Sequence, residues 1–259
     1  MSFSIIIPSR NIENLLRCVA AIRSAGELAR VIVIWDGDET PSIDWSTFPD
    51  HGSGCYFHWG PTPFCFARNC NIGIRAAGAD DVFIWNDDAL LEAKPESRPL
   101  TDMVRAIEYS IFESNQPWGV VSCAVSGHAG QAYLSANVTA EWRGKPRSLW
   151  PIREPMSRKM VPFTAVYIPR RVIDAVGLLD DRFAGEINGE PVYGGEDDAY
   201  CYECRKRGFS IGVFDGAVVN HGVLPSTFRP DGKGRSIEGA RMRFQEIYGF
   251  QMGTRWDYI

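Results

Sequence analysis

The sequence predicts an α/β fold with a doubly wound, mostly parallel sheet. Within the first ninety residues, short apolar runs alternate with amphipathic segments of helical period, which is the pattern of parallel strands joined by helices. The 259 residues are 45% hydrophobic and 23% charged, values typical of a globular protein that buries roughly 70–75% of its unfolded surface. Because no linker-like or repetitive segment interrupts the chain, we expect a single domain over residues 1–259.

The first strand and helix follow from hydrophobic patterning. Phe3–Pro8 is a continuous apolar, β-branched run, as expected for a strand buried on both faces. Asn11 then has the residue type of a helix N-cap, and Leu15, Val19 and Ile22 recur on one face of the helix that follows. The other elements expected in this half are strands at Val31–Trp35, Cys55–Trp59 and Val82–Trp85 and a helix at Ala67–Ala77.

The second half is less regular. Its first helix is marked by Leu100, Val104, Ile107 and Ile111 at helical spacing. The segment 126–161 mixes Gly, Pro, Arg and Trp without a sustained period, and a long irregular stretch is more often functional than idle. The remaining expected elements are strands at Trp118–Ser122, Thr164–Ile168, Phe209–Phe214 and Ala217–Asn220, and helices at Arg170–Val176, Glu196–Arg207 and Ile237–Tyr248.

Composition excludes several classes of protein. The formal net charge of −5 argues against a protein that holds nucleic acid on a broad basic face. The first residues lack the basic segment and cleavage site of a signal peptide, and the apolar runs are far shorter than the ~20 residues of a membrane span. Seven cysteines are an odd number, so we expect reduced thiols and a cytoplasmic protein. Cys201 and Cys204 form a C-x-x-C pair, for which packing on a buried helix face is favoured over a zinc site.

Polar clusters follow three predicted strands. They are Pro8–Arg10, Asp36–Asp38 and Asn86–Asp88, and the carboxyl ends of strands are where ligands bind in open α/β sheets. One such cluster is commonly a turn or a helix cap. Three on neighbouring strands gather like charges that a divalent cation or a ligand's hydrogen-bond donors would relieve. Seen alone, Asn86–Asp88 is equally compatible with a metal site and with a turn.

Two further features lie in the second half. Gly194–Asp198 opens a predicted helix with three carboxylates, which are favourable in a first helical turn and could also supply a general base. His221 ends a strand-like run. A single His is more often structural, but at a strand end beside acidic clusters it is a candidate metal ligand.

Taken in order, these segments resemble the family-2 glycosyltransferases of the GT-A fold. Asn86–Asp88 falls where that family has its Asp-x-Asp metal motif, and Gly194–Asp198 is similar to the segment that carries its catalytic Glu-Asp pair. The other matching segments are Ser4–Asn11, Val31–Asp38, Phe66–Ile74, Gly177–Phe183, Arg205–Phe209 and His221. The resemblance implies a Rossmann-like GT-A fold in which residues 1–90 bind the nucleotide and residues 91–259 form the acceptor side, ending in a helix.

The resemblance also implies an activity: metal-dependent, inverting transfer of a sugar from a UDP-, GDP- or dTDP-sugar to a hydroxyl acceptor. Asp88 and His221 would hold Mn²⁺ or Mg²⁺. Asp197 would be the general base, with Glu196 and Asp198 as alternatives. The residues expected to contact the nucleotide-sugar are Pro8, Ser9, Arg10, Asp36, Asp38, Arg68, Asn71, Asn86 and Asp87. The acceptor could be a glycan, a protein, a lipid-linked sugar or a modified nucleobase, and a homodimer stays open.

Several departures keep rival interpretations open. Asn86 replaces a carboxylate, and Ala199 and Glu203 stand where the family usually has Asp and Arg, which also fits a catalytically inactive nucleotide-sugar-binding module. A sugar-phosphate nucleotidyltransferase would need a Gly-rich loop after the first strand, and a dinucleotide oxidoreductase a G-x-G-x-x-G; neither is present. Glu186–Tyr193 resembles an insertion that shapes acceptor choice. The tryptophans of the irregular middle (Trp118, Trp142 and Trp150) are interpreted either as a sugar-stacking platform or as core residues.

Overall fold

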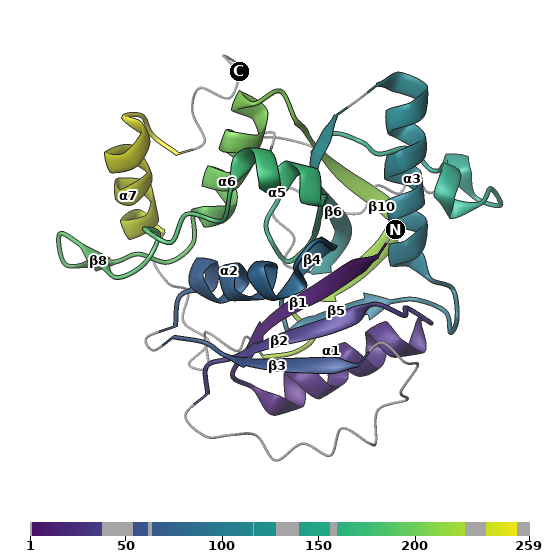
Figure 1. Ribbon diagram of the computed structural model, residues 1–259, viewed down its shortest axis with the longest axis horizontal. Helices are drawn as coiled ribbons and strands as arrows, with labels where there is room; N and C mark the ends of the chain where they lie inside the picture. Colours follow the sequence, from purple (N-terminus) through teal and green to yellow (C-terminus); the bar gives the residue numbers. More distant parts are fainter. Residues whose placement is uncertain are drawn as a thin grey trace.

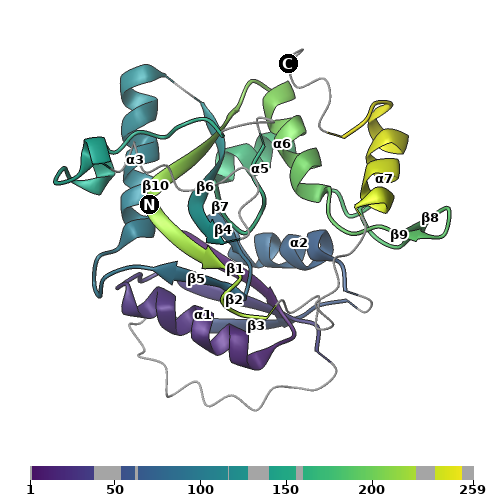
Figure 2. The ribbon, with the colours of Figure 1, turned by 180° about the vertical axis from the view of Figure 1, so that it is seen from behind.

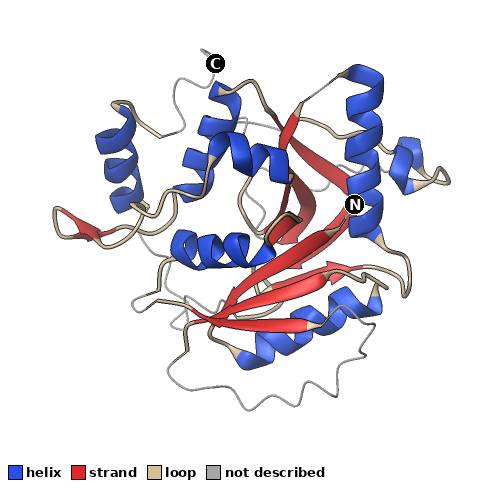
Figure 3. Cartoon of the chain, viewed as in Figure 1, coloured by secondary structure: helices blue, strands red, loops and turns tan. Residues whose placement is uncertain are grey.

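The computed structural model describes residues 2–37, 54–61, 64–115, 117–127, 140–155, 160–225 and 237–252. Within these ranges the protein is an α/β structure built around one curled, eight-stranded sheet with the strand order β3-β2-β1-β4-β7-β6-β10-β5 (Figures 1 and 3). Neighbours β3, β2, β1 and β4 run parallel, as do β6 and β10, while β7 and β5 are antiparallel to their neighbours. The predicted fold class is therefore confirmed.

The first half of the sheet agrees closely with the sequence pattern. Its strands are β1 (Phe3–Ser9), β2 (Arg30–Trp35), β3 (Cys55–Trp59) and β4 (Asp81–Trp85). Helices α1 (Ile12–Ser24) and α2 (Phe66–Ala77) cover opposite faces of these strands (Figures 1 and 2).

Two local features explain how these helices are held. Asn11 is the N-cap of α1, because its side chain accepts the Asn14 N–H at 3.2 Å. Gly73 lets α2 lie directly on β1, because a Cβ at this position would come within 2.3 Å of the Ile6 side chain. The cap therefore starts α1 close to the end of β1, and Gly73 allows the close approach of α2 to the sheet.

The second half of the sheet differs from expectation in two places. A short strand, β5 (Ala89–Glu92), was not predicted. The two strands expected at 209–214 and 217–220 are one strand, β10 (Ser210–His221), with an irregularity between Phe214 and Val218. The buried Asp215, paired with Arg153 at 2.7 and 2.9 Å, interrupts the apolar pattern there, which is why the sequence suggests two elements. The other elements of this half are α3 (Pro99–Ser114), β6 (Trp118–Gly127), β7 (Ala165–Ile168), α5 (Arg170–Val176) and α6 (Glu196–Lys206).

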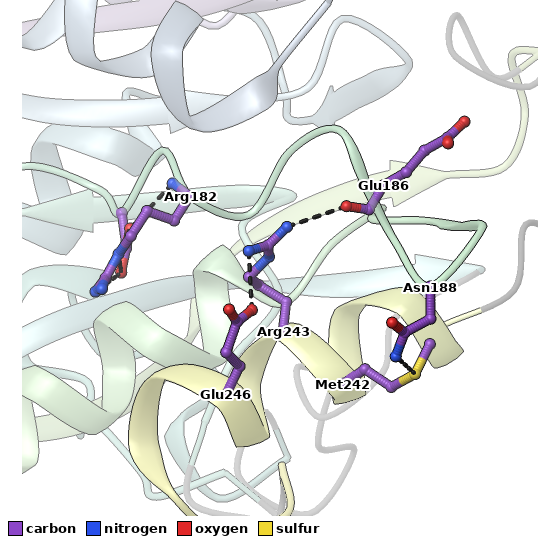
Figure 4. A network of polar contacts seen from close by, with 7 residues as sticks. Arg182, Glu186, Asn188, Met242, Arg243 and Glu246 are labelled. Atoms are coloured by element: carbon purple, nitrogen blue, oxygen red, sulfur yellow. Dashed lines mark hydrogen bonds and ion pairs between the residues drawn. The ribbon is translucent and has the colours of Figure 1, made fainter.

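The apparent insertion before α6 is a small hairpin, β8 (Glu186–Ile187) and β9 (Glu190–Pro191), which packs against the C-terminal helix α7 (Glu238–Tyr248). Arg243 donates to the Glu186 carbonyl at 3.2 Å and pairs with Glu246 at 2.9 Å (Figure 4). A second hydrophobic cluster, separate from the main core, fills this junction; it consists of Phe183, Val192, Ala199 and Phe244. Across the described ranges, no helix has the length and apolarity needed to span a bilayer.

The irregular middle of the chain contributes to the opposite side of the molecule. A short 3₁₀ helix, η2 (Arg147–Leu149), packs against α3. Trp118 is buried in the main core, Trp150 packs against that core, and the Trp142 ring holds the Lys145 ammonium at 3.8 Å. Residues 128–139 and 156–159 of this segment lie outside the described ranges.

Candidate active site at the carboxyl ends of the strands

The polar clusters predicted from the sequence meet at one edge of the sheet. At the end of β1, the Ser9 hydroxyl donates to Asp87 Oδ2 at 2.5 Å, and the next residue, Arg10, reaches the buried carboxylate of Asp36 through Nε at 3.2 Å and Nη2 at 3.1 Å. At the end of β10, His221 Nε2 lies 3.3 Å from Asp88 Oδ1. The ends of β1, β2, β4 and β10 therefore form one polar edge.

The turn between β4 and β5 brings Asp88 to His221. The Asn86 carbonyl accepts the Ala89 N–H at 3.1 Å, and the indole N–H of Trp85 donates to the Ala89 carbonyl at 2.8 Å, so both ends of the turn are held. Strand β5 then pairs antiparallel with β10, with Ala89 opposite His221. This register explains why residues 133 positions apart in the sequence lie side by side, since Asp88 directly precedes Ala89.

A cleft of about 350 Å³ opens beside this edge. Its polar lining includes Asn86 and His221 from the polar edge and Glu196, Asp197 and Asp198 from the start of α6. Much of the remaining wall is apolar, and includes Phe64, Phe66, Pro162, Phe163, Phe183, Val192, Tyr193 and Ile237. The cleft thus joins the two acidic motifs that are more than a hundred residues apart in the sequence.

The first turn of α6 places the three carboxylates. Gly194 and Gly195 precede the helix with φ angles of +81° and +95°, a left-handed backbone that favours glycine. A Cβ on Gly195 would also come within 2.9 Å of the Phe183 ring, so the close packing of this ring against residue 195 requires glycine as well. The Asp198 N–H donates to Asp197 Oδ1 at 2.9 Å, and negative charge is favourable at a helix N-terminus.

The carboxylates of this turn do not ionise equally. Burial raises the pKa of Glu196 to about 8, and repulsion from Asp197 and Asp198 adds to the rise. Burial also raises the pKa of Asp197, but backbone N–H groups at the start of the helix and from Phe163 stabilise its ionised form and limit the increase. At neutral pH the Glu196 carboxyl therefore retains its proton in most molecules, which makes Asp197 the better proton acceptor of the two.

Three of the predicted nucleotide-sugar contacts are engaged within the protein. Ser9 and Asp87 are fully buried and bonded to each other. The Asn71 amide donates to the Leu179 carbonyl at 2.8 Å and accepts the Leu179 N–H at 2.9 Å, so it fastens α2 to the loop before α6. These contacts join β1 to the turn after β4 and α2 to the loop before α6.

The other predicted contacts differ in accessibility. Arg10 is exposed, and its guanidinium lies 5.5 Å from the centre of the Phe64 ring, a residue that lines the cleft. Arg68 is exposed and 3.7 Å from Asp181, while Pro8 is buried in β1. Asp38 lies outside the described residues. The buried carboxylate of Asp36 pairs with the partly exposed Arg10 side chain.

The cleft also contains residues that the sequence did not single out. The aromatic rings of Phe64, Phe163 and Phe183 follow no period, and each belongs to a loop, so only the fold brings them together. Asn69 is buried beside Asp36, with its amide nitrogen 3.5 Å from that carboxylate. Conversely, Trp118, Trp142 and Trp150 do not line the cleft. Trp118 is a core residue, which is the second of the two interpretations of these tryptophans.

The residues at the polar edge suit a hard divalent cation. The carboxylate of Asp88 and the imidazole of His221 are adjacent, and the buried Oδ1 of Asn86 in the same cleft has no hydrogen-bond partner among the described residues. The described part of the chain holds no group of three or more His, Cys, Asp or Glu residues in ligating arrangement. The remaining ligands of a cation here would have to come from Asn86, from water or from a bound diphosphate. All seven cysteines are free thiols, and Cys201 and Cys204 pack in the main core.

Comparison with known proteins identifies the fold. No protein-family model matches this sequence, and neither does any curated protein sequence. Among solved structures, GalNAc-T7 with UDP, GalNAc and Mn²⁺ is similar to this chain with a TM-score of 0.58 and 11% identity, over 85% of this chain and 44% of that one. Residues 1–349 of S. aureus TarS give a TM-score of 0.59 and 12% identity, over 85% of this chain and 60% of that one.

Both of these proteins are glycosyltransferases of the GT-A fold. This chain spans less than two thirds of the length of either. The TM-scores of 0.58 and 0.59 establish the GT-A fold for this protein. Because the identities are only 11% and 12%, its chemistry has to be argued from its own residues.

Proposed function

We propose that this protein is a metal-dependent, inverting glycosyltransferase that moves a sugar from a nucleotide-diphosphate sugar to a hydroxyl acceptor. One observation carries the proposal: a single cleft joins the polar strand edge of Asn86 and His221 to the carboxylates at the start of α6. The GalNAc-T7 structure of the same fold contains UDP, GalNAc and Mn²⁺, which supports a donor of this class. In this proposal residues 1–90 bind the nucleotide and residues 91–259 supply the acceptor side.

The polar edge would bind the donor. Arg10, held by Asp36 and lying against Phe64, would contact the nucleotide, and Asp88 with His221 would hold Mn²⁺ or Mg²⁺. A cation at this position supplies Lewis acidity that offsets the negative charge of the departing nucleoside diphosphate. The apolar wall of the cleft would exclude water from the anomeric carbon and so favour transfer over hydrolysis.

The α6 turn would activate the acceptor. Asp197 would remove the proton of the acceptor hydroxyl as its oxygen attacks the anomeric carbon from the face opposite the leaving diphosphate. Glu196 and Asp198 are the alternative bases; Glu196 is less suited because its raised pKa keeps it protonated at neutral pH. A single attack of this kind inverts the configuration of the sugar.

One observation favours a second candidate, a nucleotide-sugar-binding module without catalysis. Asn86 supplies an amide where a carboxylate would hold a cation more strongly, and the described residues contain no group of three or more His, Cys, Asp or Glu side chains that could hold a metal ion. For the transferase, the proposed acceptor is a glycan, a protein, a lipid-linked sugar or a modified nucleobase. The seven free thiols support the cytoplasm as the compartment in which the protein works.

The stereochemistry of the reaction tests the proposal. UDP-, GDP- and dTDP-sugars with an α-linked donor bond are incubated with the protein, Mn²⁺ and hydroxyl acceptors. The anomeric proton coupling of the first product is then read by NMR, before mutarotation where that product is a free sugar. We expect a β-configured product. An α-configured product would refute the role of Asp197 as the base of a single inverting attack, and a donor that binds without reacting would favour the binding module.

A further inference from the structure

The middle residue of the Asn86–Asp88 run is fully buried. Asp87 has no exposed surface, and of the three residues only Asn86 lines the cleft. Its Oδ2 accepts the Ser9 hydroxyl at 2.5 Å, and Ser9 is equally buried. The Ser9 oxygen also accepts the N–H of Asn11, the N-cap of α1, at 3.2 Å. Asp87 therefore faces the junction of β1 and α1.

This hydrogen bond lies between the Arg10–Asp36 ion pair and the Asp88–His221 contact of the polar edge. Ser9 directly precedes Arg10, which pairs with Asp36 at the end of β2. Asp87 directly precedes Asp88, which lies against His221 at the end of β10. A chain of contacts thus runs from the residues proposed for the nucleotide, across Ser9 and Asp87, to the residues proposed for the cation.

We propose that Asp87 is a positioning residue that couples nucleotide binding to cation binding through Ser9. The inference rests on the proposed function, because it assigns the two ends of the chain to a nucleotide and a cation. A buried hydrogen bond to a carboxylate is strong and holds both partners in one geometry. Binding sites need their ligating groups held to within roughly 0.5 Å of the productive geometry. A relaxed turn between β4 and β5 would therefore weaken the binding of the nucleotide and of the cation together.

The structure offers a matched control at the other end of the same two strands. Ser4, also fully buried, donates to Asp80 at 2.7 Å and so joins the start of β1 to the residue before β4. Like Ser9 and Asp87, this pair joins a buried serine of β1 to an aspartate beside β4, and Asp80 in addition forms an ion pair with Arg30 at 3.0 Å. It lies at the amino ends of the strands, away from the cleft, so its loss should affect stability alone.

The experiment measures coupling by calorimetric titration of the full chain. Mn²⁺ alone, UDP alone and UDP in saturating Mn²⁺ are titrated into the wild type, Ser9→Ala, Asp87→Asn and the double variant, with GDP and dTDP used in place of UDP where UDP does not bind. The coupling factor is the ratio of the nucleotide Kd without Mn²⁺ to that with Mn²⁺. Allosteric and linked sites typically show factors of about 5–150.

We expect Ser9→Ala and Asp87→Asn to reduce the coupling factor by similar amounts, at least about fivefold, and the double variant to add little to either. Ser4→Ala and Asp80→Asn should lower the melting temperature without changing the coupling factor. Ser9→Ala removes only a hydroxyl from a buried position, so it decides the question if Asp87→Asn does not fold.

Two results would overturn the inference. One is a coupling factor in both Ser9→Ala and Asp87→Asn that equals the wild-type value. The other is a loss of Mn²⁺ affinity in Asp87→Asn that Ser9→Ala does not share, which would make Asp87 a direct ligand. A wild-type protein that binds none of the three nucleotides is a different outcome, because it would refute the proposed function itself.

Discussion

Replacing Glu196 by Gln should stabilise the protein at alkaline pH. The folded state holds the pKa of this carboxyl at about 8 against an ordinary 4.5, mainly because burial disfavours the charged form. A raised pKa means that the stability contributed by the neutral carboxyl is complete below pH 4.5 and is lost as the pH rises through about 8. At about 1.4 kcal/mol per pH unit, the rise from 4.5 to about 8 corresponds to roughly 5 kcal/mol as an upper limit. Sharing of the charge with Asp197 reduces this to about 2–4 kcal/mol.

Urea unfolding of the wild type and Glu196→Gln at pH 5, 7 and 9 measures the effect. The two proteins should have nearly equal unfolding free energies at pH 5, and the variant should be more stable by about 2–4 kcal/mol at pH 9. Glu113→Gln, the same change at an exposed position of α3, is the control. A difference between wild type and Glu196→Gln that does not grow with pH would refute the argument that burial keeps this carboxyl protonated.

Three further predictions follow from the site and its supports. Asp88→Ala should abolish Mn²⁺-dependent nucleotide binding without unfolding the protein. His221→Ala should weaken this binding, and excess Mn²⁺ should partly restore it. Nucleotide titrations at several Mn²⁺ concentrations check both variants. Because burial raises the pKa of Asp197, the acidic limb of the kcat profile should lie above the ordinary aspartate value of about 3.9, and a limb at or below that value would exclude Asp197 as the base. Gly239→Ala would bring a Cβ within 2.2 Å of the Pro191 carbonyl oxygen. This variant should lower the unfolding free energy by about 1–3 kcal/mol while UDP affinity stays unchanged. Equal urea midpoints for wild type and variant would show that α7 does not pack tightly on β9.

The sequence predicts the first half of the sheet well because three of its four strands, β1, β2 and β4, are buried on both faces. Phe3–Pro8 and Val31–Trp35 are continuous apolar runs, and the strands observed there differ from the expected bounds by one residue at most. Strand β5 could not be predicted in this way. It has only four residues, and its pairing with β10 depends on a partner more than a hundred residues away.

The residue types of the candidate site could be predicted from the sequence, but the directions in which their side chains point could not. Parallel strands end at the same edge of a sheet, so the sequence indicates correctly that Ser9, Asp36 and Asp88 come close together. It does not indicate that Asp87 turns inward while its neighbour Asp88 meets His221, since adjacent residues in a turn differ only in their backbone angles. Nor does it reveal that Asn71 is engaged by the backbone of Leu179, a contact across 108 positions.

The most direct test of the proposed function is the release of nucleoside diphosphate from UDP-, GDP- and dTDP-sugars by the wild type and by Asp197→Asn. Both are assayed with Mn²⁺ and hydroxyl acceptors, with Asp174→Asn, an exposed change on α5, as the control. We predict that the wild type and the control release nucleotide from at least one donor. Asp197→Asn should bind that donor with near wild-type affinity while its turnover falls at least ~10²-fold. A wild type that binds the donor and releases nothing, or an Asp197→Asn variant that turns over like the wild type, would contradict the proposal.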